Sequence, residues 1–148
     1  MKIEKVSEEI VSDLFIKGID CSQIVLGYAA ERAGLCDETA IKVSSAFGGG
    51  MWCSRTCGVV TGALMALGMK YGHYRESDMT ERKNTILAKR AEFEQKFANE
   101  NGSVICKDIL GYDLSKPEDF NQVIEKGLFF TLCTKVVCSG CKILDEMM

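Results

Sequence analysis

The sequence predicts an all-α fold, a single-domain helical bundle around a glycine-rich central helix. No segment alternates apolar and polar residues with the period of two that marks a half-buried strand. The 148 residues include a single proline, so few positions would interrupt a helix. The run from Thr56 to Met69 is uncharged and bounded by Arg55 and Lys70. Because a bilayer-spanning helix needs about 20 apolar residues, this shorter run suits a helix buried inside the protein.

The N-terminal third predicts three helices before the central one. An apolar stripe at helical spacing covers residues 2–17, and Gly18 ends it. Asp20 can cap a second helix that closes at Gly34. Asp37 can cap a third, short helix that runs to about Ala46. Cys21 would then lie in the first turn of the second helix, where the helix dipole favours a thiolate.

The C-terminal half predicts a long charged helix followed by three shorter ones. The charged helix starts at Ser77 or Asp78 and runs to about Asn99, with Asp78 and Glu81 at capping-box spacing. Shorter helices are expected over residues 104–110, 115–127 and 133–147. With 47% hydrophobic residues, the whole chain, residues 1–148, is expected to form one domain with a substantial core.

Glycines recur along the central helix, at Gly58, Gly62, Gly68 and Gly72. Each glycine in a helix interior costs roughly 1 kcal/mol relative to alanine. The spacing therefore indicates that something approaches the backbone closely. A neighbouring helix, a second subunit or a bulky inorganic group would each explain it, and Gly58 and Gly62 are the positions assigned to such a group.

Composition narrows the function classes. A net charge of −3 argues against nucleic-acid binding. The first fifteen residues are charged and amphipathic without a secretory cleavage site, so we expect a cytoplasmic protein without membrane insertion. Eight cysteines in a reducing compartment favour metal binding or redox chemistry over structural disulfides. The alternative is that these cysteines serve as small hydrophobic core residues.

Four cysteines are expected at or near helix starts, namely Cys21, Cys57, Cys106 and Cys133. If these helix starts converge, they supply four thiolates and backbone N–H donors at one point. Four thiolates are the usual ligand set of an iron–sulfur cluster, which is the cofactor we expect. Trp52 could shield such a site from solvent. No Ser/His/Asp or Cys/His set points to an enzyme of another kind, so enzymatic activity stays open.

Two alternatives to an iron–sulfur cluster use other cysteines. One needs no metal, and the other needs a single zinc ion. In a thiol–disulfide protein, Cys57 would be the low-pKa attacking thiol, with Cys53 or Cys21 as the resolving thiol. In a zinc-stabilised binding module, Cys53 and Cys57 could combine with Cys138 and Cys141, the Cys-x-x-Cys pair. Cys36 is interpreted as a turn thiol.

These landmarks resemble a known family. Cys21 stands in DCSQIVL, Cys57 begins CGVVTG and leads into GALMALGMKYG, Cys106 precedes KDILGYDLS, and Cys133 precedes the last helix. The sequence is similar to the redox-active family named after its C-GCAxxG-C-C cysteine pattern, although Val59 stands where the family usually has alanine. That family is similar to the non-haem part of split-Soret cytochromes, which hold an iron–sulfur cluster.

The resemblance implies a cluster or redox role for Cys21, Cys57, Cys106 and Cys133. Haem attachment is not expected, because the chain has no Cys-x-x-Cys-His. A redox protein of this kind would exchange electrons with a partner protein that the sequence does not identify. The glycine-bearing face and the narrow apolar stripe on residues 79–97 make a homodimer a further expectation.

Overall fold

The computed structural model describes all residues from Met1 to Met148 and confirms the all-α class. Its only β-type pairing is one isolated antiparallel bridge between Thr56 and Ile105. The α-helices are α1 (Glu8–Ile16), α2 (Cys21–Ala33), α3 (Asp37–Val43), α4 (Gly58–Tyr71), α5 (Met79–Asn101), α6 (Cys106–Leu110), α7 (Pro117–Glu125) and α8 (Thr134–Met147). Two π-helical segments, Gly50–Ser54 and Phe129–Cys133, and a 3-10 turn, Glu76–Asp78, complete the elements.

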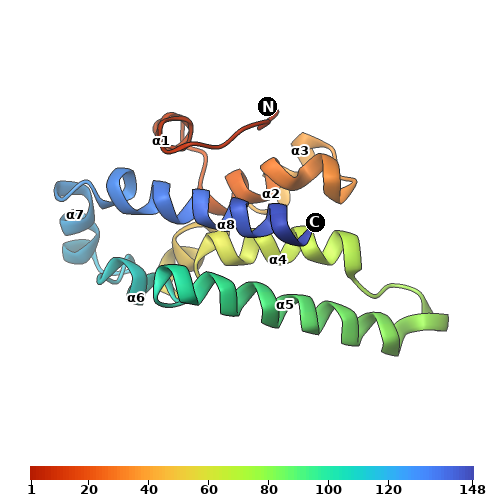
Figure 1. Ribbon diagram of the computed structural model, residues 1–148. Helices are drawn as coiled ribbons and strands as arrows, with labels where there is room; N and C mark the ends of the chain where they lie inside the picture. The colour runs from red at the N-terminus through yellow and green to blue at the C-terminus, as the bar shows by residue number, and fades with distance from the viewer.

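The core forms around α4, which packs against α2, α5 and α8 (Figure 1). The largest fully buried side chains come from all four of these helices, with Val11 of α1 and Val123 of α7 added. α1 lies across α8 on the outside of the bundle, and α3 folds back on α2. The prediction that other helices wrap the central helix is therefore confirmed.

The first helix is shorter than its apolar stripe predicted. Residues 2–6 are extended, and Ser7 caps α1 by accepting a hydrogen bond from the Ile10 N–H at 3.1 Å. The extended arm places Ile3 in the core, where it lies against Gly27. Apolar periodicity marks which residues are buried, but a local side-chain cap decided where the helix begins.

Other helix boundaries agree more closely with expectation. Asp20 caps α2 through a capping box with Gln23, and Gly34 ends that helix in the left-handed conformation. α3 stops at Val43, three residues before the expected end. The predicted capping box of Asp78 and Glu81 does not form, because Asp78 makes no side-chain cap hydrogen bond.

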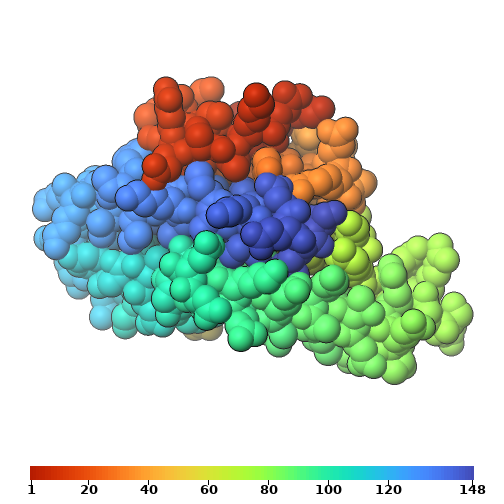
Figure 2. All heavy atoms as spheres, viewed as in Figure 1, coloured from red at the N-terminus to blue at the C-terminus, as the bar shows by residue number.

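The N-terminal part of α5 extends beyond the rest of the molecule (Figures 1 and 2). Its buried residues, Phe93 and Phe97, stack on each other near its C-terminal end, where the helix contacts the core. Exposed residues cover the N-terminal part, as the sequence pattern of mixed charges predicted.

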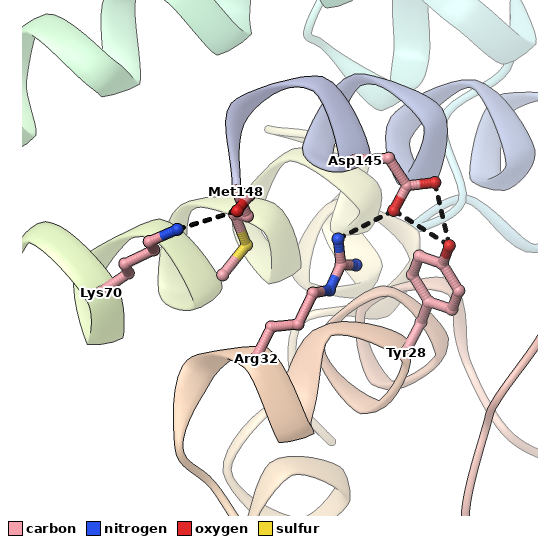
Figure 3. Close-up of polar contacts among 5 residues, drawn as sticks. All are labelled: Tyr28, Arg32, Lys70, Asp145 and Met148. Carbon is pink, nitrogen blue, oxygen red and sulfur yellow. Dashed lines mark hydrogen bonds and ion pairs between the residues drawn. The ribbon is translucent and has the colours of Figure 1, made fainter.

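Polar contacts tie α8 to α2 and α4 (Figure 3). The Tyr28 hydroxyl donates to the Asp145 carboxylate, and Arg32 forms an ion pair with the same carboxylate at 2.9 Å. Lys70 at the end of α4 donates to the Met148 carbonyl at 2.8 Å. These contacts hold α8 along the bundle.

No single helix is long and apolar enough to cross a membrane. α7 and the run Phe129–Met147 reach the necessary length and composition only when taken together, and they are bent by 66° at their junction.

Candidate redox centre

A mostly apolar cavity of about 280 Å³ opens at one end of the bundle. Its wall is built from the end of α1, the first turns of α2, α4 and α6, the π-helical segment before α8, and the loop around Trp52. All four cysteines expected at helix starts line it, namely Cys21, Cys57, Cys106 and Cys133. The structure therefore brings together residues separated by more than one hundred positions in sequence.

Cys21 is the first residue of α2 and faces the loop that carries the triple glycine. The Gly49 backbone lies near enough to this thiol to act against the rise in its pKa that burial causes. On the other side the sulfur lies against α4, because a Cβ placed on Gly58 would be 2.5 Å from it. Gly58 thus lets the Cys21 thiol approach the α4 backbone, which is one of the close approaches that the glycine spacing predicted.

A short antiparallel pairing holds Cys57 and Cys106 beside each other. The Cys57 N–H donates to the Val104 carbonyl at 2.8 Å, and the Cys106 N–H donates to the Arg55 carbonyl at 2.6 Å. These bonds flank the isolated bridge between Thr56 and Ile105. The two cysteines, 49 residues apart in sequence, are therefore kept in register by backbone hydrogen bonds rather than by side-chain packing alone.

Cys133 reaches the cavity differently. It ends the π-helical segment Phe129–Cys133, and its backbone is already helical, so α8 continues from it without a break. Phe129 and Phe130 of this segment also line the cavity, and Phe130 makes an edge-to-face contact with Phe15 of α1. The expected helix start at Cys133 agrees with the position of α8. However, no free helix N-terminus lies there, because the π-helical segment runs directly into α8.

The loop before α4 contains a left-handed turn. Gly49, Gly50, Met51 and Trp52 follow one another with φ between 55° and 63°. For a residue other than glycine this conformation costs about 1–2 kcal/mol. The turn places Trp52 at the cavity, where 42% of the residue stays exposed.

Burial controls the electrostatics of the cavity thiols. It raises the pKa of Cys21, Cys57, Cys106 and Cys133, and a neighbouring cysteine raises the pKa of the last three further. Burial raises the pKa of Cys106 to about 12, although the nearby Ser54 side chain acts in the opposite direction. No lysine, arginine or histidine lines the cavity to compensate a thiolate charge.

The expectation of low-pKa thiols at helix N-termini is therefore wrong for Cys21 and Cys57. Backbone N–H groups do lower their pKa, but desolvation is the larger effect. Without a positively charged group in the cavity, these thiols are neutral at physiological pH.

The comparison with protein families agrees with this arrangement. The family model described as "Putative redox-active protein (C_GCAxxG_C_C)" matches residues 19–147, which include all four cavity cysteines. The chain belongs to the C_GCAxxG_C_C family. No curated protein and no solved structure matches the chain.

Within α4, Gly62 serves a different purpose from Gly58. It does not line the cavity. A Cβ on Gly62 would lie 2.7 Å from the Ser22 carbonyl oxygen, so this glycine permits close packing of α4 on α2. The structure places Gly62 at a helix–helix contact, whereas Gly58 lines the site.

The other four cysteines lie outside the C_GCAxxG_C_C cavity. Cys36 and Cys53 are exposed, Cys138 is half-buried on α8, and Cys141 is fully buried in the core. No group of three or more His, Cys, Asp or Glu side chains is close enough to hold a metal ion. The structure therefore does not assemble Cys53, Cys57, Cys138 and Cys141 into the zinc site considered from sequence.

Sequence reasoning missed several residues of the site. Ser54, Leu114, Phe129 and Phe130 surround the cysteines, yet none stands in a motif that would mark it. Phe129 and Phe130 precede Cys133 directly, and an apolar pair beside a candidate ligand was the one available signal. Ser54 and Leu114 are 60 residues apart in sequence, and only the folded chain brings them together.

Proposed function

We propose that this protein transfers electrons or senses redox state through an iron–sulfur cluster held by Cys21, Cys57, Cys106 and Cys133. The observation that carries the proposal is the arrival of four thiols, from four separate elements, on the wall of one apolar cavity. Thiolate sulfur is the usual ligand of such clusters. Membership in a family described as redox-active supports the same conclusion.

Charge supports a metal-containing group over free thiols. Burial raises the pKa of each cavity thiol, and no cationic side chain lines the cavity. Four thiolates would be unstable there unless a positively charged group compensated them. Iron ions supply that charge and would deprotonate the thiols on binding.

The shape of the site favours a cluster over a single ion. A zinc ion requires its sulfur ligands at about 2.3 Å, which brings all four sulfurs together around one point. Here the thiols are spread over the cavity wall, and no three of them are close enough to hold one ion. A group of several atoms would span the space between them, and Gly58 keeps one wall free of a side chain.

The residues around the thiols have three roles in this proposal. Apolar side chains exclude water, which protects a cluster from hydrolysis and makes its potential sensitive to nearby dipoles. The Gly49 backbone near Cys21 supplies one such dipole. Trp52 covers the cavity while staying partly exposed, so a partner protein could approach closely. A bound iron–sulfur cluster would supply reversible one-electron transfer.

Thiol–disulfide exchange is the second candidate. The closeness of the Cys21 sulfur to Gly58, the residue after Cys57, favours a bond between Cys21 and Cys57 upon oxidation. The raised pKa values of both thiols oppose it, because the thiolate is the attacking species. Cys53, the other resolving thiol considered, is exposed and does not line the cavity.

Metal analysis of protein purified without oxygen tests the proposal. We expect iron and sulfide in stoichiometric amounts, with visible absorption that is lost in Cys57→Ser and Cys106→Ser. Matched controls are Cys36→Ser and Cys53→Ser, which remove exposed thiols outside the cavity and should retain iron. Protein that takes up no iron even after anaerobic reconstitution would contradict the cluster and leave thiol–disulfide exchange as the better explanation.

A further inference from the structure

The Cys-x-x-Cys pair of Cys138 and Cys141 lies on α8, outside the cavity that the other candidate thiols line. Cys138 is half-buried and packs against the edge of the core. Cys141 belongs to the core itself and has no exposed surface. The cluster proposed for the cavity uses neither thiol, so the pair is free to take part in other chemistry.

Helix geometry brings the two residues of this pair within reach of one disulfide bond. Both belong to the continuous helix Thr134–Met147, three positions apart. With a rise of about 1.5 Å and a rotation of about 100° per residue, their Cα atoms are about 5 Å apart. Disulfide-bonded cysteines usually have Cα atoms about 4.4–6.8 Å apart. Their Cβ atoms, about 5–6 Å apart on a regular helix, would approach by about 1–2 Å, so this turn of α8 must bend slightly.

The cavity cysteine on the same run of helix cannot compete for this bond. Cys133 precedes Cys138 by five residues and Cys141 by eight, and its backbone is already helical. On a helix these separations place the Cα atoms about 9 Å and about 12 Å apart, beyond the roughly 7 Å that a disulfide can span. Along α8, Cys138 and Cys141 are therefore partners only for each other.

Unequal burial gives the two thiols different parts in an oxidation. A dissolved oxidant can reach Cys138, which is only partly covered, but it cannot reach Cys141. Cys141 can therefore react only with a group that Cys138 already carries, one helical turn away. An accessible attacking thiol beside a shielded resolving thiol is the arrangement that thiol–disulfide exchange through a mixed disulfide requires.

The charges around the pair do not stabilise its reduced form. Burial raises the pKa of both thiols, and Glu8 adds to the rise at Cys138. At Cys141, Asp145 adds to the rise and Arg32 opposes it. A dithiol that gains no stabilisation as thiolate has a lower reduction potential than one that does, so its disulfide is the harder to reduce. The same raised pKa values make the attack slow, because the thiolate is the attacking species.

We propose that Cys138 and Cys141 form a second redox site, a dithiol that a low-molecular-weight disulfide converts to a disulfide within α8. The Cys138 thiolate attacks one sulfur of the small disulfide, whose S–S bond breaks, and the first small thiol leaves. The Cys141 thiolate then attacks the Cys138 sulfur and displaces the second small thiol. Two electrons pass from the protein pair to the small disulfide, and the two protein thiol protons are balanced by those on the two small thiols. The reaction needs no cluster in the cavity.

Thiol labelling of the full-length protein tests this site. Reduced protein is incubated without oxygen in excess glutathione disulfide, quenched with acid and labelled in denaturant with N-ethylmaleimide. Trypsin cleaves after Lys135 and Lys142, and the resulting peptide, residues 136–142, contains no cysteine other than this pair. We expect mass spectrometry to find this peptide without label and lighter by two hydrogen atoms.

Two variants separate the attacking from the resolving thiol. In Cys141→Ala, the mixed disulfide of Cys138 with glutathione should accumulate on the order of tenfold more than in the unsubstituted protein, because the adjacent thiol that displaces glutathione is gone. In Cys138→Ala, Cys141 should stay reduced and take up N-ethylmaleimide. Cys36 is the internal control, an exposed thiol with no second cysteine on its short helix, and should form a lasting mixed disulfide.

The peptide also shows when the proposal is wrong. Two labels on it, in protein whose Cys36 has reacted with glutathione, would overturn the inference. A mixed disulfide that persists at Cys138 in the unsubstituted protein would do the same, as would a bond from either residue to a cavity cysteine. If circular dichroism shows that Cys141→Ala does not fold, the peptide from the unsubstituted protein still decides. Iron content does not enter this readout, so a failure of the cluster proposal would leave this result intact.

Discussion

Gly62 of α4 and Ser22 of α2 lie so close that a Cβ on Gly62 would be 2.7 Å from the Ser22 carbonyl oxygen. Ser22 follows Cys21 directly, and Gly62 lies one helical turn after Gly58. The contact between the two helices therefore also sets how near the Cys21 thiol comes to the start of α4. Close helix packing and the geometry of the cavity depend on the same pair of elements.

Substitution of Gly62 should be costly for this reason. We expect Gly62→Ala to lower the free energy of unfolding by about 1–3 kcal/mol, because a methyl group would collide with backbone that cannot rotate away. Chemical denaturation would measure the loss. Gly68→Ala is the matched control in the same helix, since nothing lies within 4 Å of the added Cβ. It should stabilise the protein by about 0.5–1 kcal/mol. Equal effects at the two positions would contradict the packing argument.

Cys36 should be the most reactive thiol of the metal-free protein towards alkylating agents. It is exposed, and hydrogen bonds from the Thr39 side chain and backbone N–H lower its pKa. The Sγ–Oγ1 distance is 3.0 Å. Mass spectrometry after brief treatment with iodoacetamide should find Cys36 modified first. Thr39→Val should slow this reaction several-fold, whereas Ser45→Ala, a hydroxyl removed from the C-terminal side of the same helix, should not. Faster labelling of Cys57 than of Cys36 would refute the expectation.

Stability of the metal-free protein should fall at alkaline pH because of Cys106. Burial raises its pKa from about 9 to about 12, so the folded state retains a proton that the unfolded state has lost. The stabilisation is complete below about pH 9 and is lost as the pH rises through about 12. The total effect is a few kcal/mol on the scale of about 1.4 kcal/mol per pKa unit.

Comparison with a variant isolates this contribution from other groups that titrate in the same range. The free energy of unfolding, measured from pH 8 to 11, should decline less steeply in Cys106→Ala than in the unsubstituted protein. Identical slopes would show that the Cys106 thiol is not protonated preferentially in the folded state.

Trp52 should limit access to the cavity thiols. It lines the cavity from the left-handed turn, and its removal would open the wall to solvent. We expect Trp52→Ala to increase the alkylation rate of Cys57 and Cys133 several-fold in metal-free protein. Tyr74→Ala is the control, because Tyr74 is exposed and does not line the cavity. An unchanged rate in Trp52→Ala would mean that other residues exclude the reagent.

Local signals in the sequence were sufficient to predict most of the helices of the fold. Asp20 with Gln23, Gly34 and Pro117 mark helix ends through hydrogen bonds and backbone preferences that involve only neighbouring residues. The narrow apolar stripe predicted on residues 79–97 includes Phe93 and Phe97, the buried residues of α5, but it also includes Met79, which is exposed. Where two local signals competed, as at Ser7 within the apolar stripe of the first helix, the boundary was wrong.

The four-cysteine set was also accessible from sequence, because helix starts could be assigned one by one and the family resemblance supported the same residues. The pKa values of these cysteines could not be predicted in the same way. A thiol at a helix N-terminus is predicted to be acidic from local structure, but the cavity around Cys57 raises its pKa, since desolvation depends on residues from α1, α6 and α8.

What the order of residues determined on its own is the set of α-helices, several of their ends and the identity of the cysteines, since each depends on interactions within a few residues. Tertiary structure alone decided that Gly58 borders the cavity beside Cys21 while Gly62 contacts Ser22, and that Leu114 bonds to Ser54. These relationships join residues between 37 and 60 positions apart, and only packing of the whole bundle determines which distant groups meet and how much water remains between them.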